Sequence, residues 1–408
     1  MKVIKDSVHD HIAISGVALD LLDTPAMQRL RRIAQLGTVS LVYPSANHTR
    51  FEHSLGVYHL ASEALEHLNV AGVAADRVRA AALLHDVGHA PFSHNVEDLL
   101  HRRTGRYHDD VAHLLSEGAV GEVLTDHGLD PDRIATLIAG EGQFGQLISG
   151  ELDVDRMDYL VRDAHHTGVP YGTIDHSRLV RELTFVDGEL VLAEGNVQAA
   201  ESLLVARALM NPTVYSHKVA RISKAMLRRA TAALLDDGGV TASDVARMDD
   251  HELMVALRQH GKGSRYIDRL DRRDLYKRAV WAEIDDVPGE VVEGDAPAMR
   301  DWEGEIANRA GVDPADVVID VPERPAMRES TARVVVNGEV RRLGAQSPLV
   351  DALREAGYAQ WRLGVYAPAA VVDRVGPTAA DVLGLDVDGS LVSEVGTELH
   401  ATLDQFEA

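Results

Sequence analysis

The sequence contains no cysteine, has fewer basic than acidic residues, and has no long hydrophobic run. Without cysteine the chain forms no disulfide and offers no thiolate to a metal, so histidine, aspartate and glutamate are the candidate ligands for a transition metal or magnesium. No window approaches the roughly 18 uncharged apolar residues of a membrane-spanning helix. The first ten residues also lack the apolar segment and cleavage site of a signal peptide. We therefore expect a cytoplasmic protein without a membrane partner.

The charge balance restricts the class of binding partner. Acidic residues outnumber basic ones by 64 to 41, which gives a formal net charge of −23. This charge argues against a broad duplex-DNA surface, because such binding depends on neutralising phosphates with lysine and arginine. A small anionic substrate is still compatible with it if a local pocket of arginine, lysine and metal charge meets that substrate. With 408 residues, 45% of them hydrophobic, the chain is long enough for two or three globular domains.

Helical patterns dominate residues 1–235. The segment 21–36 contains the helix-start signal Asp23-Thr24-Pro25, and apolar residues recur at helical spacing along 51–68. A hairpin is expected at 183–192, around Asp187-Gly188. We expect further helices over 77–87, 96–100, 109–115, 131–139, 198–210 and 215–235, and another after Gly150.

The residue pattern of the sequence changes after residue 235. A helical boundary region is expected over 236–268, and short β-type runs with helices between them follow in 269–408, two of them joined by the turn Asn337-Gly338. Residues 285–305 are acidic and rich in glycine and proline, which favours an exposed loop. The expected fold class is mainly α, with a helical core that includes a short hairpin and a smaller C-terminal α+β lobe.

An adjacent His85–Asp86 pair ends the apolar helical run within 80–94. An imidazole nitrogen and a carboxylate oxygen can bind one metal ion together. His53 and Asp155 lie in helices expected to be buried, and they would complete a mixed nitrogen and oxygen set that suits Mn, Mg, Fe or Zn. Each residue alone has an ordinary structural explanation, such as a core histidine or a helix cap. The metal site is therefore a hypothesis about their convergence.

Three segments, HTRFEHSLGVYHLA, ALLHDVGHAPFSH and DVDRMDYLVRDAHHTGV, resemble the HD-domain metal-dependent phosphohydrolases. The detail is most similar to the branch of deoxynucleoside triphosphate triphosphohydrolases that includes the vertebrate antiviral SAM-and-HD-domain enzyme. The match runs through residues 1–94, returns at 150–168 and 203–219, and is weaker in the C-terminal lobe. The resemblance implies an HD-domain helical core with one divalent metal ion, and it implies the same four ligands: His53, His85, Asp86 and Asp155.

The resemblance also implies catalytic residues around the phosphates. These are His89, His94 and His108, with Glu97 positioned to orient a histidine, although the family more often has aspartate at the Glu97 position. A histidine with an ordinary pKa near 6.5 can protonate the departing 5′-oxygen. His94 is the first choice for that role, and His108 is the second.

Substrate-binding residues follow from the same resemblance. The positions near the triphosphate are Arg50, Arg156 and Arg207. The positions near the sugar 3′-hydroxyl are Gln35, Tyr159 and Asp163, and those that crowd the 2′-carbon are Leu36 and Tyr215. Arg156 replaces a lysine of the family, which keeps the charge and changes the geometry of phosphate binding.

A further group matches positions that bind an activating nucleotide at a subunit interface in the antiviral enzyme. Its members are Lys2, Val3, Asp23, Gln28, Arg31, Arg273 and Lys277. The alternative is a capped amphipathic helix with a cationic face. If a shared nucleotide site exists here, an activating GTP or dNTP and a homodimer or homotetramer follow from it.

The leading hypothesis is hydrolysis of a deoxynucleoside triphosphate to the deoxynucleoside and inorganic triphosphate. A metal ion would hold a phosphate oxygen and lower the pKa of its bound water from about 15.7 toward about 7. Within the same superfamily, the alternative is a nucleotide phosphomonoesterase or phosphodiesterase. From other classes, the alternatives are a non-catalytic nucleotide-responsive module and a single-stranded nuclease, and the net charge of −23 counts against the nuclease.

Overall fold

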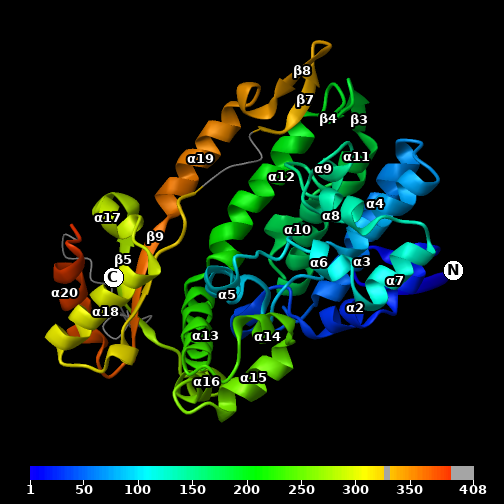
Figure 1. Cartoon of the computed structure of the whole chain (residues 1–408). Coiled ribbons are helices and arrows are strands. Elements are labelled where there is room, and N and C mark those ends of the chain that lie inside the picture. Colours follow the sequence, from blue (N-terminus) through cyan, green and yellow to red (C-terminus); the bar gives the residue numbers. More distant parts are fainter. Residues whose placement is uncertain (326–330, 387–408) are drawn as a thin grey trace, which may run out of the picture. The chain divides into compact units, whose positions relative to one another are not determined.

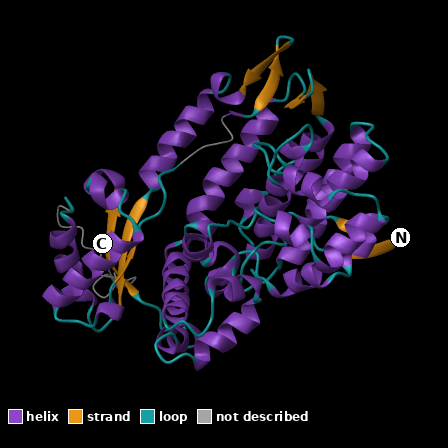
Figure 2. Cartoon of the chain, viewed as in Figure 1, coloured by secondary structure: helices purple, strands orange, loops and turns teal. Residues whose placement is uncertain are grey.

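The computed structural model describes residues 1–325 and 331–386, and most of these residues are helical (Figure 2). The chain divides into two compact units. Unit 1 comprises residues 1–220, 227–268 and 327–354, and unit 2 comprises residues 221–226, 269–326 and 355–408. The expected fold class is confirmed, because a helical core is accompanied by a smaller lobe that mixes strands and helices. Within the described residues, no helix has the length and apolarity needed to cross a membrane.

The N-terminal segment forms a hairpin followed by short helices. Strands β1 (Lys2–Asp6) and β2 (Asp10–Ile14) pair antiparallel, and α1 (Val17–Leu22), α2 (Pro25–Arg29) and a 3-10 turn (Leu30–Arg32) follow. The predicted helix over 21–36 is therefore wrong in its extent. The chain leaves the helical conformation at Ile33 because Ala34 forms a β-bridge with Thr49 and donates its N–H to Asp250.

Three helices form the centre of unit 1 (Figure 1): α3 (Arg50–His67), α4 (Val73–Leu84) and α10 (Val154–Thr167). Helix α3 packs against both of the others. Thr49 and Glu52 form a capping box at its start, which satisfies backbone donors that a helix end leaves unpaired. Leu60 and other apolar side chains of α3 are fully buried, and each contributes about 1.5–3 kcal/mol to stability relative to exposure.

Further helices surround this centre. They are α5 (Glu97–Thr104), α6 (Ala112–Leu115), α7 (Gly118–Asp126), α8 (Pro131–Ile138), α9 (Gly145–Ile148), α11 (His176–Arg181), α12 (Val197–Met210), α14 (Ala242–Arg247) and α15 (Asp250–Gln259). Helices α13 (Lys218–Asp236) and α16 (Ser264–Asp271) contribute residues to both units. A π-helical turn, Asn211–Tyr215, contains Pro212 and separates α12 from α13.

Unit 1 also holds a four-stranded sheet with the order β3-β4-β7-β8. Its strands are β3 (Leu183–Val186), β4 (Glu189–Leu192), β7 (Arg333–Val336) and β8 (Glu339–Arg342), and they lie side by side in Figure 1. Both predicted hairpins are present, and the turn residues Asp187-Gly188 and Asn337-Gly338 have positive φ angles, as two-residue hairpin turns require. The second hairpin belongs to unit 1 and not to the C-terminal lobe, because Leu192 pairs with Val334 and Val334 is buried in the core.

Unit 2 contains a three-stranded antiparallel sheet with the order β5-β9-β6. Its strands are β5 (Lys277–Glu283), β6 (Val318–Asp320) and β9 (Arg362–Ala367), and its helices are α17 (Gly289–Val292), α18 (Ala296–Ala310) and α20 (Val372–Leu383). Helix α19 (Pro348–Gln360) contributes residues to both units.

The prediction of an acidic loop over 285–305 is wrong, because most of that segment lies in α17 and α18. Asp295 caps α18 by accepting the N–H of Ala298, and Pro297 lies in the first helical turn, where its missing N–H costs nothing. Ile306 and Ala307 are buried in the core of unit 2. Capping residues and an apolar face therefore form a helix from residues whose composition favours a loop.

Candidate metal centre and active site

The four predicted ligands meet at the centre of unit 1. His53 comes from α3, His85 and Asp86 follow the end of α4, and Asp155 lies in the first turn of α10. His53 Nε2 is 2.8 Å from Asp155 Oδ1 and 3.3 Å from His85 Nε2. His85 Nε2 is 3.3 Å from Asp86 Oδ1. The structure brings all four predicted residues together.

These donor atoms fit a metal ion. Two ligands at right angles, each about 2.1 Å from an ion, are about 3 Å apart, and the separations here are close to that value. His85 Nδ1 donates to the carbonyl oxygen of Ala82 at 2.9 Å, which leaves Nε2 free to bind an ion. The set of two imidazoles and two carboxylates suits a divalent ion of the Mn, Fe, Mg or Zn type.

A buried carboxylate behind His53 holds its ring in place. Asp158 accepts from His53 Nδ1 at 2.7 Å and from His9 Nε2 at 2.6 Å. It also accepts from Arg162 Nε at 2.8 Å, and Arg162 Nη1 donates to Asp6 Oδ2 at 2.9 Å. Asp158 and Arg162 are fully buried. A carboxylate on the far nitrogen of a ligating histidine fixes the tautomer and the ring orientation, so this network directs Nε2 toward the ligand cluster.

The electrostatic field of the centre favours a cation. Burial lowers the pKa of His53, but hydrogen bonds to Asp155 and Asp158 and the charge of Asp86 outweigh this effect and raise the pKa to about 10. Burial raises the pKa of Asp86, but Arg50, His85 and His89 hold it well below its usual range. The carboxylates of Asp86 and Asp155 are therefore ionised, and their negative charge favours a cation. His53 would release its Nε2 proton to bind an ion, because a ligating imidazole is neutral.

A second cluster joins the three predicted catalytic histidines to Glu97. Glu97 accepts from His94 Nδ1 at 2.5 Å and from His108 Nδ1, and also from the backbone N–H of His108 at 3.1 Å. The rings of His89 and His108 are stacked with their centroids 4.0 Å apart. His89 Nε2 lies 3.2 Å from Asp86 Oδ1, so this cluster adjoins the metal centre. The four predicted residues are therefore in contact with one another.

Glu97 sets the protonation of this cluster. Burial raises its pKa, but hydrogen bonds from His108 and His94 outweigh burial and hold the pKa well below the usual range. Desolvation by the surrounding cluster lowers the pKa of both histidines, although the side chain of His94 is more than half exposed, and Glu97 opposes this effect. The balance leaves the pKa of His94 lowered and that of His108 raised. Because Glu97 takes the Nδ1 side of both rings, their Nε2 atoms remain for other partners.

The predicted sugar-binding residues also form a group. Tyr159 and Asp163 lie one turn apart on α10, on the face that carries Asp155. Tyr215 donates its hydroxyl to Asp163 Oδ2 at 2.9 Å, and His48 Nε2 contacts Asp163 Oδ1 at 2.8 Å. The rings of Tyr159 and Tyr215 meet edge to face with centroids 6.2 Å apart. Burial and the charge of Asp163 raise the pKa of Tyr215 well above its ordinary value.

The predicted arginines have different partners. Arg50 Nη1 lies 3.1 and 3.0 Å from the two oxygens of Asp86, so it neutralises a predicted metal ligand. Arg156 donates to the carbonyl oxygens of Gly150 and Glu151 at 2.6 and 2.7 Å. The positive charge of Arg207 acts on Tyr159, whose pKa burial raises and that charge lowers.

Two predicted residues precede α3. Gln35 is buried, and its Oε1 has no hydrogen-bond partner within the described part of the chain. Leu36 is half-buried and packs against the core of unit 1. An unpaired buried amide oxygen is costly in an apolar environment, which makes Gln35 suited to accept a hydrogen bond from a ligand.

The predicted regulatory residues lie in both units. In unit 1, Lys2 Nζ is 3.9 Å from Asp23 Oδ1, and Arg31 Nε donates to Gln28 Oε1 at 3.0 Å. Val3 is exposed on β1. Arg273 and Lys277 belong to unit 2, so the assembly of all seven residues into one site stays a prediction.

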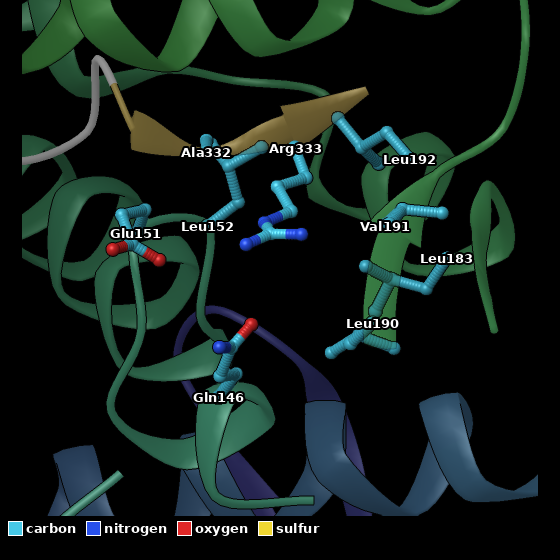
Figure 3. A pocket seen from close by; sticks show the side chains of 9 residues that line it. All are labelled: Gln146, Glu151, Leu152, Leu183, Leu190, Val191, Leu192, Ala332 and Arg333. Carbon is cyan, nitrogen blue, oxygen red and sulfur yellow. The ribbon is translucent and has the colours of Figure 1, made fainter. Parts of the chain in front are cut away.

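One pocket in unit 1 shares no residue with the metal centre (Figure 3). Figure 3 shows the side chain of Arg333 extending into the space between Gln146 and Leu190. The guanidinium group of Arg333 pairs with Glu189. The lining residues are Gln146, Glu151, Leu152, Leu183, Leu190, Val191, Leu192, Ala332 and Arg333.

Sequence reasoning missed the residues that support the ligands, chiefly His9, Asp158, Arg162 and Asp250. Asp158 and Arg162 are four positions apart on α10, a spacing that reads as an ordinary surface ion pair. The available signal was the position of Asp158, one turn after Asp155 on a helix with apolar residues on either side of it. The contacts of His9 and Asp250 join residues far apart in sequence, which no local pattern indicates.

Two known protein families match the chain. The HD domain family matches residues 50–163, and the HD associated region matches residues 174–394. An uncharacterised protein of Methanocaldococcus jannaschii is 36% identical over 382 residues, which are 90% of this chain and 79% of that protein. The crystal structure of a phosphohydrolase from Bacteroides thetaiotaomicron superimposes on this chain with a TM-score of 0.71 and is 25% identical in sequence. The superposition covers 90% of this chain and 100% of the phosphohydrolase.

A third relative has a named activity. The deoxynucleoside triphosphate triphosphohydrolase SAMHD1 homolog of Dictyostelium discoideum is 31% identical over 255 residues. The matched region is 56% of this chain and 48% of that relative, so the similarity spans about half of each protein.

Proposed function

The chain belongs to the HD-domain metal-dependent phosphohydrolases, and we propose that it hydrolyses deoxynucleoside triphosphates to the deoxynucleoside and inorganic triphosphate. The observation that carries the proposal is one contiguous arrangement: His89 lies 3.2 Å from the predicted ligand Asp86, and Asp163, on the helix that carries Asp155, accepts the hydroxyl of Tyr215. The similarity to a named triphosphohydrolase supports the choice of substrate class.

His53, His85, Asp86 and Asp155 would hold the ion, and Mn, Mg, Fe and Zn are all compatible with this set. When bound, the ion supplies positive charge for a phosphate oxygen and lowers the pKa of a coordinated water. Arg50 keeps Asp86 ionised and adds a second positive charge beside the phosphates. His9, Asp158 and Arg162 keep His53 oriented toward the ion.

The leaving 5′-oxygen needs a proton, and the cluster around Glu97 can supply it. Glu97 fixes the Nδ1 side of His94 and His108, so that either Nε2 can donate. The exposure of the His94 side chain, 54%, favours His94 as the group that reaches substrate. The raised pKa of His108 favours His108 as the group that carries the proton at neutral pH. We propose His94 as the acid, which donates from Nε2 when its ring is protonated, and His108 as the second candidate, whose charge is coupled to that of His94 in the same cluster.

Sugar recognition would rest on Asp163 and Tyr215. Each carboxylate oxygen of Asp163 already has one partner, and each can accept a further hydrogen bond, so Asp163 can take one from a 3′-hydroxyl. Tyr159 would border the sugar, with Gln35 as a further acceptor. Tyr215 and Leu36 would form the wall beside the 2′-carbon, which leaves a ribose 2′-hydroxyl without space or partner.

The triphosphate would be met by Arg207 and Arg156. Arg156 is held by two backbone carbonyls, so it binds a phosphate by exchanging these partners or contributes charge from a distance. Lys2, Val3, Asp23, Gln28 and Arg31 would bind an activating GTP or dNTP together with Arg273 and Lys277, and a homodimer or homotetramer would complete that site.

The test is a product assay. The purified protein is incubated with each of the four dNTPs and Mn²⁺ or Mg²⁺, with and without GTP, and the phosphate products are separated by anion-exchange chromatography. We expect tripolyphosphate from at least one dNTP, and no product from the double variant His85→Ala, Asp86→Ala. Pyrophosphate or single phosphate as the first product would instead identify a phosphodiesterase or phosphomonoesterase. A metal-loaded protein that binds dNTP and releases no product would identify a regulatory module.

A further inference from the structure

The loop between His89 and Glu97 adopts a backbone conformation that its sequence does not favour. Phe92 and Ser93 both have positive φ angles, 56° and 55°, and neither is glycine or asparagine. Each such residue costs on the order of 1–2 kcal/mol, and it persists only where surrounding contacts enforce the conformation. The loop carries His94, the proposed proton donor, so the contacts that enforce it decide where His94 lies.

One carboxylate at the start of α15 provides two of these contacts. Asp250 Oδ1 accepts the backbone N–H of Phe92 at 2.6 Å, and Asp250 Oδ2 accepts the backbone N–H of Ala34 at 2.9 Å. Asp250 is buried. Ala34 immediately precedes Gln35, the predicted sugar-binding amide, so the same carboxylate fixes two separate segments of the active site.

The surrounding contacts complete a clamp that we name by its central residue, Asp250. Ser93 donates its hydroxyl to the carbonyl oxygen of Ala34 at 2.6 Å, which joins the two segments directly. Arg29 donates to the carbonyl oxygen of His89 at 2.8 Å and to that of Met248 at 2.6 Å. The start of α15 therefore holds the loop directly at Phe92, and the turn before it holds the loop at His89 through Arg29 of α2.

We propose that Asp250 is a positioning residue for catalysis, whose carboxylate holds the Phe92 and Ala34 amides and thereby places His94 and Gln35 against the substrate. This inference rests on the proposed function. Asp250 touches no predicted metal ligand, so its effect falls on the placement of the proton donor and the sugar. Burial raises the pKa of Asp250 to about 6. At neutral pH the buried carboxylate that binds these two amides is therefore ionised, which lowers the stability of the folded protein.

The matched pair of variants is Asp250→Asn and Asp249→Asn. Asp249 is the adjacent carboxylate, and it caps α15 through the N–H of Glu252 and pairs with Arg32 without touching the loop. Asparagine is also a good helix cap, so Asp249→Asn retains the start of α15. In Asp250→Asn one amide donor faces the new side-chain NH₂ group, and the loop loses one of its two anchors.

The first measurement is amide hydrogen exchange over residues 90–95, read by mass spectrometry. We expect the Phe92 amide to exchange faster by about tenfold or more in Asp250→Asn, since loss of a buried hydrogen bond lowers the local opening free energy. We expect Asp249→Asn to match the wild type. Unchanged exchange in Asp250→Asn would overturn the clamp. This result does not depend on the substrate, so it tells failure of the clamp from failure of the proposed function.

The second measurement is steady-state kinetics on whichever dNTP the wild type hydrolyses. We expect kcat of Asp250→Asn to fall by about 10–100-fold, as for a displacement near 1 Å, while Mn²⁺ affinity and the melting temperature are not reduced. A parallel loss of Mn²⁺ affinity and melting temperature would show a general structural role and overturn the proposal. So would an unchanged kcat.

A double variant keeps the test informative if the single variant is poorly folded. Phe92→Asn introduces a residue that tolerates positive φ, so the loop needs less external support. We expect Asp250→Asn combined with Phe92→Asn to retain more kcat than the product of the two single effects. A multiplicative loss would contradict the clamp.

Discussion

The substitution Asp158→Asn removes the charge that orients the ligand His53. Asp158 is fully buried and accepts hydrogen bonds from His53, His9 and Arg162 at 2.6–2.9 Å. An asparagine side chain keeps the size of aspartate, but it offers one oxygen and an NH₂ group to donors that all need acceptors. The far nitrogen of His53 then loses a charged partner, and the ring can rotate or change tautomer.

The magnitude follows from two effects. Loss of a carboxylate partner behind a ligating histidine typically costs 10–100-fold in metal affinity, which is about 1.4–2.8 kcal/mol. Leaving the buried Arg162 with fewer anionic partners costs on the order of 3 kcal/mol of stability. Arg162 retains both oxygens of Asp6, at 2.9 and 3.3 Å, so the loss of stability lies at the lower end of that class.

The assay is a Mn²⁺ titration of the chelator-treated protein by isothermal calorimetry, with circular dichroism as a check on folding. The control is His9→Gln, which removes one donor from Asp158 and leaves its bonds with His53 and Arg162, and we expect it to change Mn²⁺ affinity by less than the Asp158 variant. If folded Asp158→Asn binds Mn²⁺ as tightly as the wild type, Asp158 does not orient His53 and the reasoning fails.

Three further outcomes are expected. His94→Gln lowers kcat by about 10²–10⁴-fold with KM little changed. His108→Gln shifts the pH profile of kcat, because the charge of His108 lowers the pKa of His94; equal pH profiles for His108→Gln and the wild type would contradict this coupling. Tyr215→Ala opens the space beside the 2′-carbon of the sugar, so the ratio of NTP to dNTP hydrolysis should rise by about tenfold or more. The ratio is measured with both substrates in competition, and an unchanged ratio would show that Tyr215 does not select the sugar. Asp250 has a folded pKa of about 6, above the ordinary 3.8, so its contribution to stability is complete below about pH 3.8 and is lost as the pH rises through 6. The stability of the wild type relative to Asp250→Asn therefore falls by about 1–2 kcal/mol as the pH rises from 5 to 8 in urea unfolding. A difference that does not vary with pH would contradict this.

The four predicted metal ligands could be selected from local sequence together with the family resemblance, because they lie in or beside helices whose apolar residues are buried. His85–Asp86 ends an apolar run, and α3 and α10 bring His53 and Asp155 to the same point by ordinary helix packing. The two hairpins were equally local, because the dipeptides at their turns adopt positive φ angles. Such features depend on neighbours a few residues apart, which a sequence displays directly.

The residues that support the predicted ligands were not predictable in this way, and neither was the secondary structure of the segments 21–36 and 285–305. His9 reaches Asp158 across 149 positions and Asp250 reaches Phe92 across 158, so only the folded chain shows these contacts. The segment 285–305 has the composition of a loop, and burial of Ile306 with the Asp295 cap makes most of it helical. Tertiary packing outweighs composition at these places.

Hydrolysis of a dNTP in water enriched in ¹⁸O tests the central claim most directly. Attack of water on the α-phosphorus with departure of the 5′-oxygen forms one P–O bond and breaks another, so mass spectrometry should find one ¹⁸O atom in tripolyphosphate and none in the deoxynucleoside. Omission of divalent metal or the His85→Ala, Asp86→Ala variant should abolish both products. Pyrophosphate with a labelled nucleoside monophosphate, or label in the deoxynucleoside, would contradict the account.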